Sequence, residues 1–432
     1  MHKEDRREFR RKRRQRNQAL AYGILFVIIL MAALAVLSGI KIYAENRQEN
    51  NNMQEEKWED AEDAFASEEE LLPPSQEAAT PEPTMSPEEV LEQKIEETIA
   101  GMTLVEKAAG LFIVTPEAIT GVDTAVQAGE GTKAALEQYP VGGLVYFAKN
   151  MKSAEQLGEM IARTKEYSKY PLFIAVDEEG GSVNRVAQVG IAQKQPSAAE
   201  IGSTADPANA YQTGSIIGSY LAELGFNLNF APVADLSNVP GSVMKDRAYG
   251  ADAATAAPFV ASMVTGLQEQ NVTACLKHFP GIGSTTADTH DGLASTDRTS
   301  EQFRAEEFSV FRAGIEAGAE MIMVGHVGAE ALAGDLTPAS MSEAVVTGYL
   351  RNELGFDGVI ITDAMNMSAI SQYNTSEQAA VMALKAGCDM ILMPEDFTQA
   401  LAGVLNAVSQ GTVSEERIND SLRRIYRIKY AE

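Results

Sequence analysis

Cysteine, tryptophan and histidine are scarce in this sequence, whose 432 residues include two Cys, one Trp and four His. Cys275 and Cys388 both lie within apolar runs, which favours two buried free thiols over a disulfide framework or a cysteine metal site. Positive charge is also in short supply, with 35 Lys and Arg against 61 Asp and Glu, a net charge of -26. Because nucleic acid is bound through Lys and Arg, this balance argues against a nucleic acid partner.

One long segment near the N-terminus has no charge at all. Residues 1–18 are strongly basic, and the run from Ala19 to Ile40 contains no charged residue. As a helix, about 22 residues cross a hydrocarbon layer of about 30 Å. We therefore expect a cytoplasmic segment over residues 1–18 and a single transmembrane helix over residues 19–42, an uncleaved signal anchor in the cell membrane. A cleaved signal peptide is the alternative, but its apolar region is typically only about 7–15 residues long.

Residues 43–85 lack hydrophobic periodicity and are dominated by Glu, Asp, Asn, Gln and Pro. Such a composition cannot bury enough apolar surface to fold, so we expect a disordered acidic linker here. The motif SPEE at residues 86–89 has the capping residue, the early Pro and the third-position Glu that mark the start of a helix. We expect the folded, extracytoplasmic domain to span residues 86–432.

Short apolar runs alternate with amphipathic stretches throughout this domain. Most of the runs are continuous, as expected for parallel strands that are covered on both faces. Eight strand–helix units favour a (β/α)8 TIM-type barrel as a single catalytic domain. A doubly wound open sheet is the alternative, but it usually has a Gly-rich phosphate-binding turn after its first strand, and none is present. The expected strands lie in residues 110–114, 142–147, 171–177, 226–236, 272–279, 321–327, 358–364 and 388–394.

Polar side chains follow several of these runs, where each strand is expected to end. In a (β/α)8 barrel such residues gather at the C-terminal face, where reactive groups lie. The candidates are Asp177, Asp235, Lys277, His278, His326 and Asp363 at strand ends, with Arg185, Arg247, Asp288 and His290 in the loops that follow.

Three of these candidates have simpler explanations than catalysis. Asp235 is more readily explained as a residue that caps a helix or holds a turn. His326 fits a hydrogen-bonded histidine at the barrel mouth as well as it fits a functional one, and Arg247 fits a surface ion pair. Asp363 directly follows the strand residues VIIT, so its carboxylate should face the barrel mouth, which favours a functional role.

Two reaction classes use carboxylates and imidazoles at a barrel mouth. Metal-assisted hydrolysis needs several His and carboxylate ligands, but no early strand carries His-x-His and His2 precedes the apolar segment, so no metal site is expected. Glycosyl transfer to water needs a nucleophile or base below the sugar and a proton donor above the leaving oxygen. Asp363 fits the nucleophile and His290 the donor, with Asp288 placed to favour and orient the imidazolium.

The same residues carry a resemblance to a known family. The stretch KHFPGIGSTTADTH, residues 277–290, resembles the signature of the β-N-acetylhexosaminidases of glycoside hydrolase family 3. Five further blocks resemble that family in its order, so that the resemblance covers the chain from about residue 86 onward. These blocks are GMTLVEKAAGLF, AVDEEGGSVNRV, NFAPVADL, DRAYG and GVIITDAMNM.

The resemblance implies a retaining exo-β-N-acetylglucosaminidase that removes terminal β-linked N-acetylglucosamine through a covalent glycosyl-enzyme, without a metal or organic cofactor. It implies Asp363 as the nucleophile, His290 as the general acid/base and Asp288 as the partner of His290. It also implies that the sugar is held by Asp177, Arg185, Arg247, Lys277 and His278. For an enzyme anchored outside the cytoplasm, peptidoglycan fragments are the expected carbohydrate substrate.

Two other functions stay open at this point. One is a β-glucosidase or another exo-glycosidase of the same family. The other is an inactive barrel that only binds the cell wall, although the nucleophile and the donor are both present. Ile282 stands where many relatives have His or another polar residue, which predicts different packing of this loop or different contacts to the substrate. The sequence DAMNM lacks the second Asp of some relatives but keeps Asp363.

Overall fold

The computed structural model describes residues 85–287 and 292–431. The expected cytoplasmic segment and transmembrane helix (residues 1–42) lie outside the described residues, as does the expected linker up to residue 84. Within the described ranges, no helix is both long enough and apolar enough to cross a membrane.

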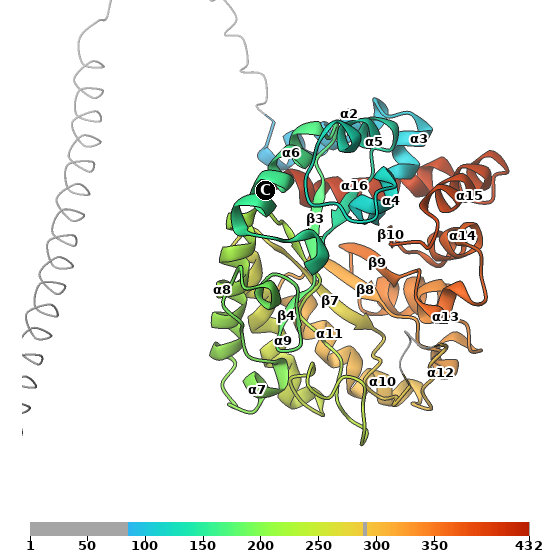
Figure 1. Cartoon of the computed structure of the whole chain (residues 1–432). Helices are drawn as coiled ribbons and strands as arrows, with labels where there is room; N and C mark the ends of the chain where they lie inside the picture. Colours follow the sequence, from blue (N-terminus) through green and yellow to red (C-terminus); the bar gives the residue numbers. More distant parts are fainter. Residues whose placement is uncertain (1–84, 288–291, 432) are drawn as a thin grey trace, which may run out of the picture. The chain divides into compact units, whose positions relative to one another are not determined.

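Eight parallel strands form a closed barrel that is surrounded by helices (Figure 1). Neighbouring strands follow the order of the chain, and the last strand pairs with the first to close the barrel. Each of the eight predicted runs contributes one strand, which confirms the barrel and excludes the open sheet. The barrel strands are β1 (Phe112–Val114), β2 (Gly143–Val145), β3 (Phe173–Val176), β6 (Leu228–Asn229), β7 (Thr273–Phe279), β8 (Met321–Val324), β9 (Val359–Ala364) and β10 (Met390–Leu392). A small antiparallel hairpin of β4 (Glu178–Gly180) and β5 (Val183–Asn184) follows β3.

Helices connect consecutive strands and cover the outside of the barrel (Figure 1). The longer ones are α2 (Pro87–Ala100), α6 (Ala154–Tyr167), α8 (Ala208–Leu224), α9 (Ala253–Gln268), α11 (Glu307–Glu316), α14 (Ser376–Ala386), α15 (Phe397–Ser409) and α16 (Glu415–Ala431). The shorter ones are α3 (Leu104–Ala109), α4 (Pro116–Thr120), α5 (Glu130–Gln138), α7 (Ala198–Gly202), α10 (Ser300–Ala305), α12 (Glu330–Ala333) and α13 (Ser368–Ser371). Turns of 3-10 helix form η1 (Ala148–Asn150), η2 (Ala187–Val189) and η3 (Ala339–Met341), and η4 (Ala344–Glu353) is a π-helix.

The start of α2 has the predicted capping box. The Glu89 N–H donates to Ser86 Oγ at 3.2 Å, and the Ser86 N–H donates to Glu89 Oε2 at 2.7 Å. Both groups would otherwise be unpaired at the helix end, and such a cap contributes about 1 kcal/mol. The capping box predicted at residues 86–89 is thereby confirmed.

The strands are buried on both faces, as their continuous apolar sequences predict. Every residue of β1, β3, β7 and β8 is buried. Aromatic rings fill the layer between the barrel and its helices. Phe279 of β7 stacks on Phe308 of α11 with ring centroids 5.3 Å apart, and it meets Phe311 edge-on at 5.1 Å. Burial of each such ring stabilises the fold by about 1.5–3 kcal/mol.

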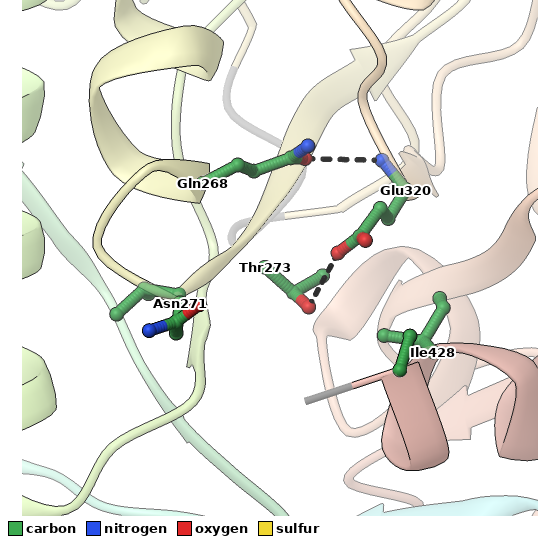
Figure 2. Close-up of a pocket in the computed structure, with 7 residues that line it drawn as sticks. Gln268, Asn271, Thr273, Glu320 and Ile428 are labelled. Atoms are coloured by element: carbon green, nitrogen blue, oxygen red, sulfur yellow. Dashed lines mark hydrogen bonds between the residues drawn. The ribbon is translucent and has the colours of Figure 1, made fainter. Parts of the chain in front are cut away.

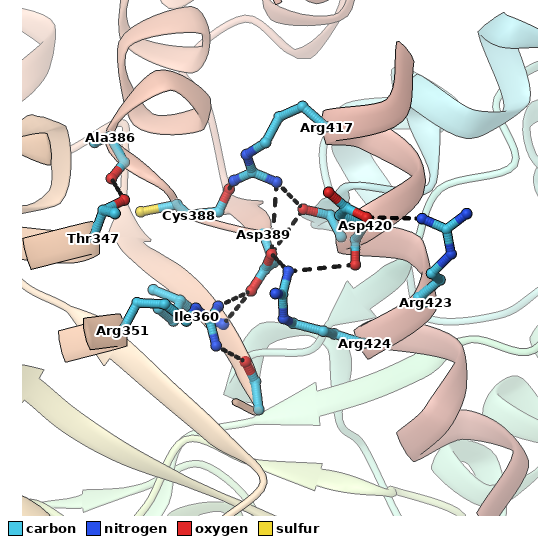
Figure 3. A network of polar contacts seen from close by, with 12 residues as sticks. Thr347, Arg351, Ile360, Ala386, Cys388, Asp389, Arg417, Asp420, Arg423 and Arg424 are labelled. Carbon is cyan, nitrogen blue, oxygen red and sulfur yellow. Dashed lines mark hydrogen bonds and ion pairs between the residues drawn. The ribbon is translucent and has the colours of Figure 1, made fainter. Parts of the chain in front are cut away.

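Asp389, immediately before β10, carries a fully buried carboxylate at the N-terminal end of the barrel. Arginine, hydroxyl and backbone donors surround it (Figure 3). They are Arg351 Nη2 at 2.7 Å, the Ile360 N–H at 3.0 Å, Ser421 Oγ at 2.8 Å and Arg424 Nη1 at 3.3 Å, with Arg417 Nη1 at 3.7 Å. These contacts join β9, β10, η4 and α16 through one charge.

A small cavity of about 80 Å³ lies at the same end of the barrel (Figure 2). It is lined by residues that precede β7 and β8 and by the end of α16. Thr273 Oγ1 donates to Glu320 Oε2 at 2.7 Å, and Gln268 Oε1 accepts from the Glu320 N–H at 3.3 Å. Burial raises the pKa of Glu320 in spite of the bond from Thr273. The cavity has room for only a few water molecules.

We predict that Asp389→Ala lowers the free energy of unfolding by about 3–5 kcal/mol, because it leaves three arginines without their shared buried counter-charge. Asp420→Ala is the matched control. Asp420 also pairs with an arginine of α16, Arg423 at 2.7 Å, but its side chain is half exposed, so its loss should cost less than about 1 kcal/mol. Chemical denaturation of both variants measures the difference, and equal losses would contradict the role given to Asp389.

Candidate active site

A cavity of about 300 Å³ opens at the C-terminal ends of the barrel strands. This volume lies at the lower end of the range for small-ligand sites, about 300–1,000 Å³. Six of the eight candidate residues that the structure describes line it, although they come from five separate parts of the chain. They are Asp177, Arg185, Arg247, Lys277, His278 and Asp363. The structure therefore brings together residues that the sequence separates by up to 186 positions, counted from Asp177 to Asp363.

Lys277, near the end of β7, lies between two carboxylates. Its Nζ is 2.7 Å from Asp177 Oδ1 and 2.7 Å from Glu179 Oε1, and its side chain is only 3% exposed. Burial disfavours the charged amine, but the two carboxylates outweigh it and raise the pKa of Lys277, even with Arg247 nearby. Lys277 is thus a fixed cation at the floor of the cavity.

Arg247 reaches the cavity from the long loop between β6 and α9. Its Nε and Nη2 donate to the two carboxylate oxygens of Glu179 at 2.9 and 2.7 Å, a two-pronged pair that fixes the plane of the guanidinium. The alternative of a surface ion pair is wrong, because the Glu179 side chain is 7% exposed and Arg247 lines the cavity. Burial opposes ionisation of Glu179, but Lys277 and Arg247 lower its pKa to about 2.

Arg185 follows the β4–β5 hairpin and differs from the other two cations. Its guanidinium lies over the ring of Phe147, 5.8 Å from the centroid. Its Nε is buried and has no hydrogen-bond partner among residues 85–287 and 292–431. The cavity therefore contains two cations that are held by carboxylates and a third with an unused donor.

Asp363 extends from the C-terminal end of β9 into the cavity. Its Oδ1 accepts from the Ala364 N–H at 2.7 Å. Burial would raise the pKa of this carboxyl group, but the charges of His278 and His326, the Ala364 N–H and Lys277 together lower it. Asp363 is therefore held as an anion, which is the form that a nucleophile requires.

Asp235 has a structural role, as the sequence suggested. It is fully buried, and its Oδ2 lies 2.8 Å from His278 Nδ1 and accepts from the His278 N–H at 3.1 Å. Its Oδ1 accepts from the Ile282 N–H at 2.6 Å. One carboxylate therefore orients the ring of His278 and holds the start of the following loop, while the Ile282 side chain forms part of the apolar wall of the cavity.

His326, just after β8, is a hydrogen-bonded histidine with a structural role, the first of the two explanations considered for it. It is fully buried and does not line the cavity. Its Nδ1 lies 2.8 Å from Ser340 Oγ, and its Nε2 lies 3.1 Å from the carbonyl oxygen of Ala364. These contacts place the imidazole behind the residue that follows Asp363.

The predicted donor His290 and its partner Asp288 lie outside the described residues. The chain on either side of them is tied to the barrel. Ser284 Oγ and Thr296 Oγ1, one on each side, are 2.8 Å apart, and Ser242 Oγ donates to the Gly283 carbonyl at 2.7 Å. Gly283 packs so closely on Leu236 that an added Cβ would lie 1.7 Å from its carbonyl oxygen. These contacts hold the base of the loop in place.

Glu307, at the start of α11, supports the same base from beneath. Its Oε1 accepts from Asn238 Nδ2 at 2.9 Å and lies 2.9 Å from Arg298 Nε, and its side chain packs against Gly281. Its Oε2 is buried and has no partner in the part of the chain that the structure describes. Burial raises the pKa of Glu307 to about 7, although Arg298 favours the charged form.

The fold and this cavity define a class: a (β/α)8 barrel with its candidate reaction site at the C-terminal ends of the strands, where such barrels carry theirs. Within that class, the glycosyl hydrolase family 3 N terminal domain matches residues 94–428, and the chain belongs to this family. The family suggested by the sequence motifs is thereby confirmed. Among the described residues, no group of three or more His, Cys, Asp or Glu is placed to hold a metal ion.

Curated relatives and solved structures agree with this assignment. A beta-hexosaminidase A of Pseudoalteromonas piscicida is 30% identical over 329 residues, 68% of this chain and 54% of that protein. A beta-hexosaminidase of Idiomarina loihiensis is 35% identical over 291 residues, 65% of this chain and 85% of that protein. The structure of a glycoside hydrolase family 3 beta-N-acetylglucosaminidase from Paenibacillus sp. str. FPU-7 matches with a TM-score of 0.72 at 35% identity, covering 76% of this chain and 62% of that one. The chain thus spans about half of the first relative and most of the second.

Glu179 is the main site residue that sequence reasoning missed. It stands two positions after Asp177 in AVDEEGG, where alternation along an extended chain places both side chains on the same side. That alternation could have identified it. The neighbouring Glu178 points the other way and accepts from the N–H groups of Val186 and Ala187 and from the hydroxyl of Tyr220.

We predict that Glu307→Gln removes a pH-dependent contribution to stability. The folded pKa of about 7 lies above the reference value of 4.5, so the contribution is complete below about pH 4.5 and is lost as the pH rises through 7. Relative to the native protein, the glutamine variant should gain up to about 3 kcal/mol between pH 4.5 and pH 8. Unfolding measured across this range tests the prediction, which fails if the difference between the two proteins is constant.

Proposed function

We propose that this protein is a retaining exo-β-N-acetylglucosaminidase. The observation that carries the proposal is Asp363, an anionic carboxylate that faces a cavity lined with charged groups able to bind hydroxyls, in a chain of glycosyl hydrolase family 3. The names of the relatives, beta-hexosaminidase and beta-N-acetylglucosaminidase, support the choice of sugar. A cavity of this size suits one terminal sugar better than the interior of a long glycan.

The proposed roles follow from chemistry and position. Sugar hydroxyl groups both donate and accept, so they are recognised by adjacent carboxylates and cations. Asp177 would accept hydrogen bonds from sugar hydroxyls, and His278 would contact them through a ring nitrogen. Lys277 and Arg247 would donate hydrogen bonds to the hydroxyl oxygens. The pairs with Glu179 fix these donors before substrate arrives, which lowers the cost of ordering them on binding.

The proposed reaction has two steps. Asp363 attacks the anomeric carbon and forms a carbon–oxygen bond, while the bond to the leaving oxygen breaks and that oxygen takes a proton from the His290 imidazolium. Water then attacks the same carbon and displaces Asp363, and His290 takes a proton from this water. Two inversions give retention. Asp288 favours the imidazolium in the first step.

We also propose the location and the natural substrate. The basic segment 1–18 and the uncharged run within residues 19–42 support a single-pass anchor with the N-terminus in the cytoplasm. The acidic linker would then separate the catalytic domain from the membrane. In that location peptidoglycan fragments that carry terminal N-acetylglucosamine are the substrates to test first.

The proposal predicts that the full chain cleaves nitrophenyl β-N-acetylglucosaminide in preference to nitrophenyl β-glucoside. Asp363→Asn should lower kcat by at least about 10³-fold, because the attacking group is lost. His290→Ala should lower it by about 10²–10⁴-fold on substrates with poor leaving groups and much less on nitrophenyl glycosides, which need little protonation. A preference for the glucoside would favour the β-glucosidase alternative. Near-native rates of both variants on a natural disaccharide, whose leaving group is poor, would refute the mechanism.

A second prediction concerns Glu179. Glu179→Gln keeps the size of the side chain but removes the charge that holds Arg247 and Lys277, so kcat/KM should fall by about 10–100-fold. Most of the loss should appear in KM, because both cations are expected to contact the bound sugar. Glu178→Gln is the matched control, since Glu178 is also buried but does not line the cavity. An unchanged KM in Glu179→Gln would contradict this role.

A further inference from the structure

Glu307, at the start of α11, contacts the chain on both sides of the loop that follows β7. Before the loop, its Cγ packs against Gly281, where an added Cβ would lie only 2.5 Å from it. After the loop, its Oε1 lies 2.9 Å from Arg298 Nε. The proposed donor His290 lies between these two positions in the sequence. One side chain therefore joins the two ends of the loop.

The helix that carries Glu307 is fixed to the barrel. Phe308, the next residue, stacks on Phe279 with ring centroids 5.3 Å apart, and Phe279 is the last residue of β7. Glu307 Oε1 also accepts from Asn238 Nδ2 at 2.9 Å, in the loop after β6. Since β7 carries His278 into the cavity, Glu307 ties the loop to the same strand that lines the cavity.

Stability alone does not account for a carboxylate at this position. Arg298 and the amide of Asn238 face it, whereas the neighbouring Glu306 bonds to the Ala253 N–H at 2.9 Å instead. The Glu307 side chain is 1% exposed, and its Oε2 has no partner within the described ranges. Burial raises the pKa of Glu307 to about 7, so its charge above that pH costs stability. A buried group that is only partly paired is expected where function requires it.

We infer that Glu307 is a positioning residue for proton transfer: its contact with Arg298 fixes the base of the loop and thereby sets the distance from His290 to the leaving oxygen. The inference rests on the proposed function, in which His290 gives its proton to that oxygen. Glu307 does not line the cavity, so it acts through the loop and not on the sugar. Placement matters because a shift of about 1 Å can lower a rate about 10²-fold.

The test compares two substrates of the full chain between about pH 5.5 and pH 8. Nitrophenyl β-N-acetylglucosaminide needs little protonation of its leaving group, whereas N,N′-diacetylchitobiose depends on it. The constant kcat/KM reports the steps up to departure of this group. At about pH 5.5, where Glu307 is protonated, Glu307→Gln should match the native protein on both substrates. At about pH 8 it should lose about tenfold on the disaccharide and less than about twofold on the nitrophenyl glycoside.

The stability of the same variant should change in the opposite direction. Glu307→Gln is expected to gain stability relative to the native protein as the pH rises, so a loss of activity at about pH 8 cannot come from unfolding. Arg298→Gln should show the same selective loss, and the double variant should lose no more than either single variant, because both changes remove one contact. Arg298→Lys keeps the positive charge and should recover part of the activity.

Glu306→Gln is the matched control. It removes a charge from the adjacent residue, whose carboxylate bonds to Ala253 and not to the loop, so both substrates should stay within about twofold of native at every pH. If Glu307→Gln lowers both substrates alike, or changes neither at about pH 8, the inference is overturned and the proposed activity stands. If the native protein cleaves neither substrate, the proposed function fails and the inference fails with it.

Discussion

A buried charge needs a counter-charge. In this barrel one carboxylate, Glu179, is the counter-charge of two buried cations, Arg247 and Lys277. Arg247 lies in the loop after β6, 68 residues beyond Glu179, and Lys277 lies in β7, the strand that follows this loop. Without Glu179 they would repel each other in a water-poor cavity, and burial would favour a neutral lysine. With it, both remain charged in fixed positions. The small hairpin β4–β5 therefore places the carboxylate that keeps Arg247 and Lys277 charged.

The two ends of the barrel use buried charge in opposite ways. At the N-terminal end, Asp389 is surrounded by donors that join the last helix to the strands. Its hydrogen-bonding capacity is therefore taken by contacts that stabilise the fold. At the C-terminal end the polar groups are only partly paired within the described ranges. There, Arg185 keeps a buried N–H without a partner, and Asp363 accepts one hydrogen bond, from the Ala364 N–H. Incomplete satisfaction of polar groups costs stability, and it is a property expected of a site that binds a polar ligand.

Much of the fold could be predicted because the barrel strands are buried on both faces and therefore appear as continuous apolar runs. All eight were found from this property, and four of the polar residues predicted at strand ends, Asp177, Lys277, His278 and Asp363, line the cavity. The partners could not be predicted in the same way. Nothing local in the sequence shows that Arg247 faces Glu179 rather than solvent, since the pair depends on how a long loop folds back over the barrel. The ring contact of His278 with Asp235 is likewise set by the spacing of two neighbouring strands.

Ile282 shows how a departure from the expected motif can be tolerated. In this chain the start of the loop after β7 is held by Asp235, and that contact uses the backbone N–H of Ile282, which any residue other than proline supplies. The side chain is therefore free to vary, and here it adds an apolar surface to the cavity wall next to His278. Because the same carboxylate also orients the imidazole of His278, the cavity-lining end of β7 and the base of the loop that carries Asp288 and His290 share one anchor. A polar side chain at position 282 would change what the cavity offers to a substrate, but it would leave this anchor in place.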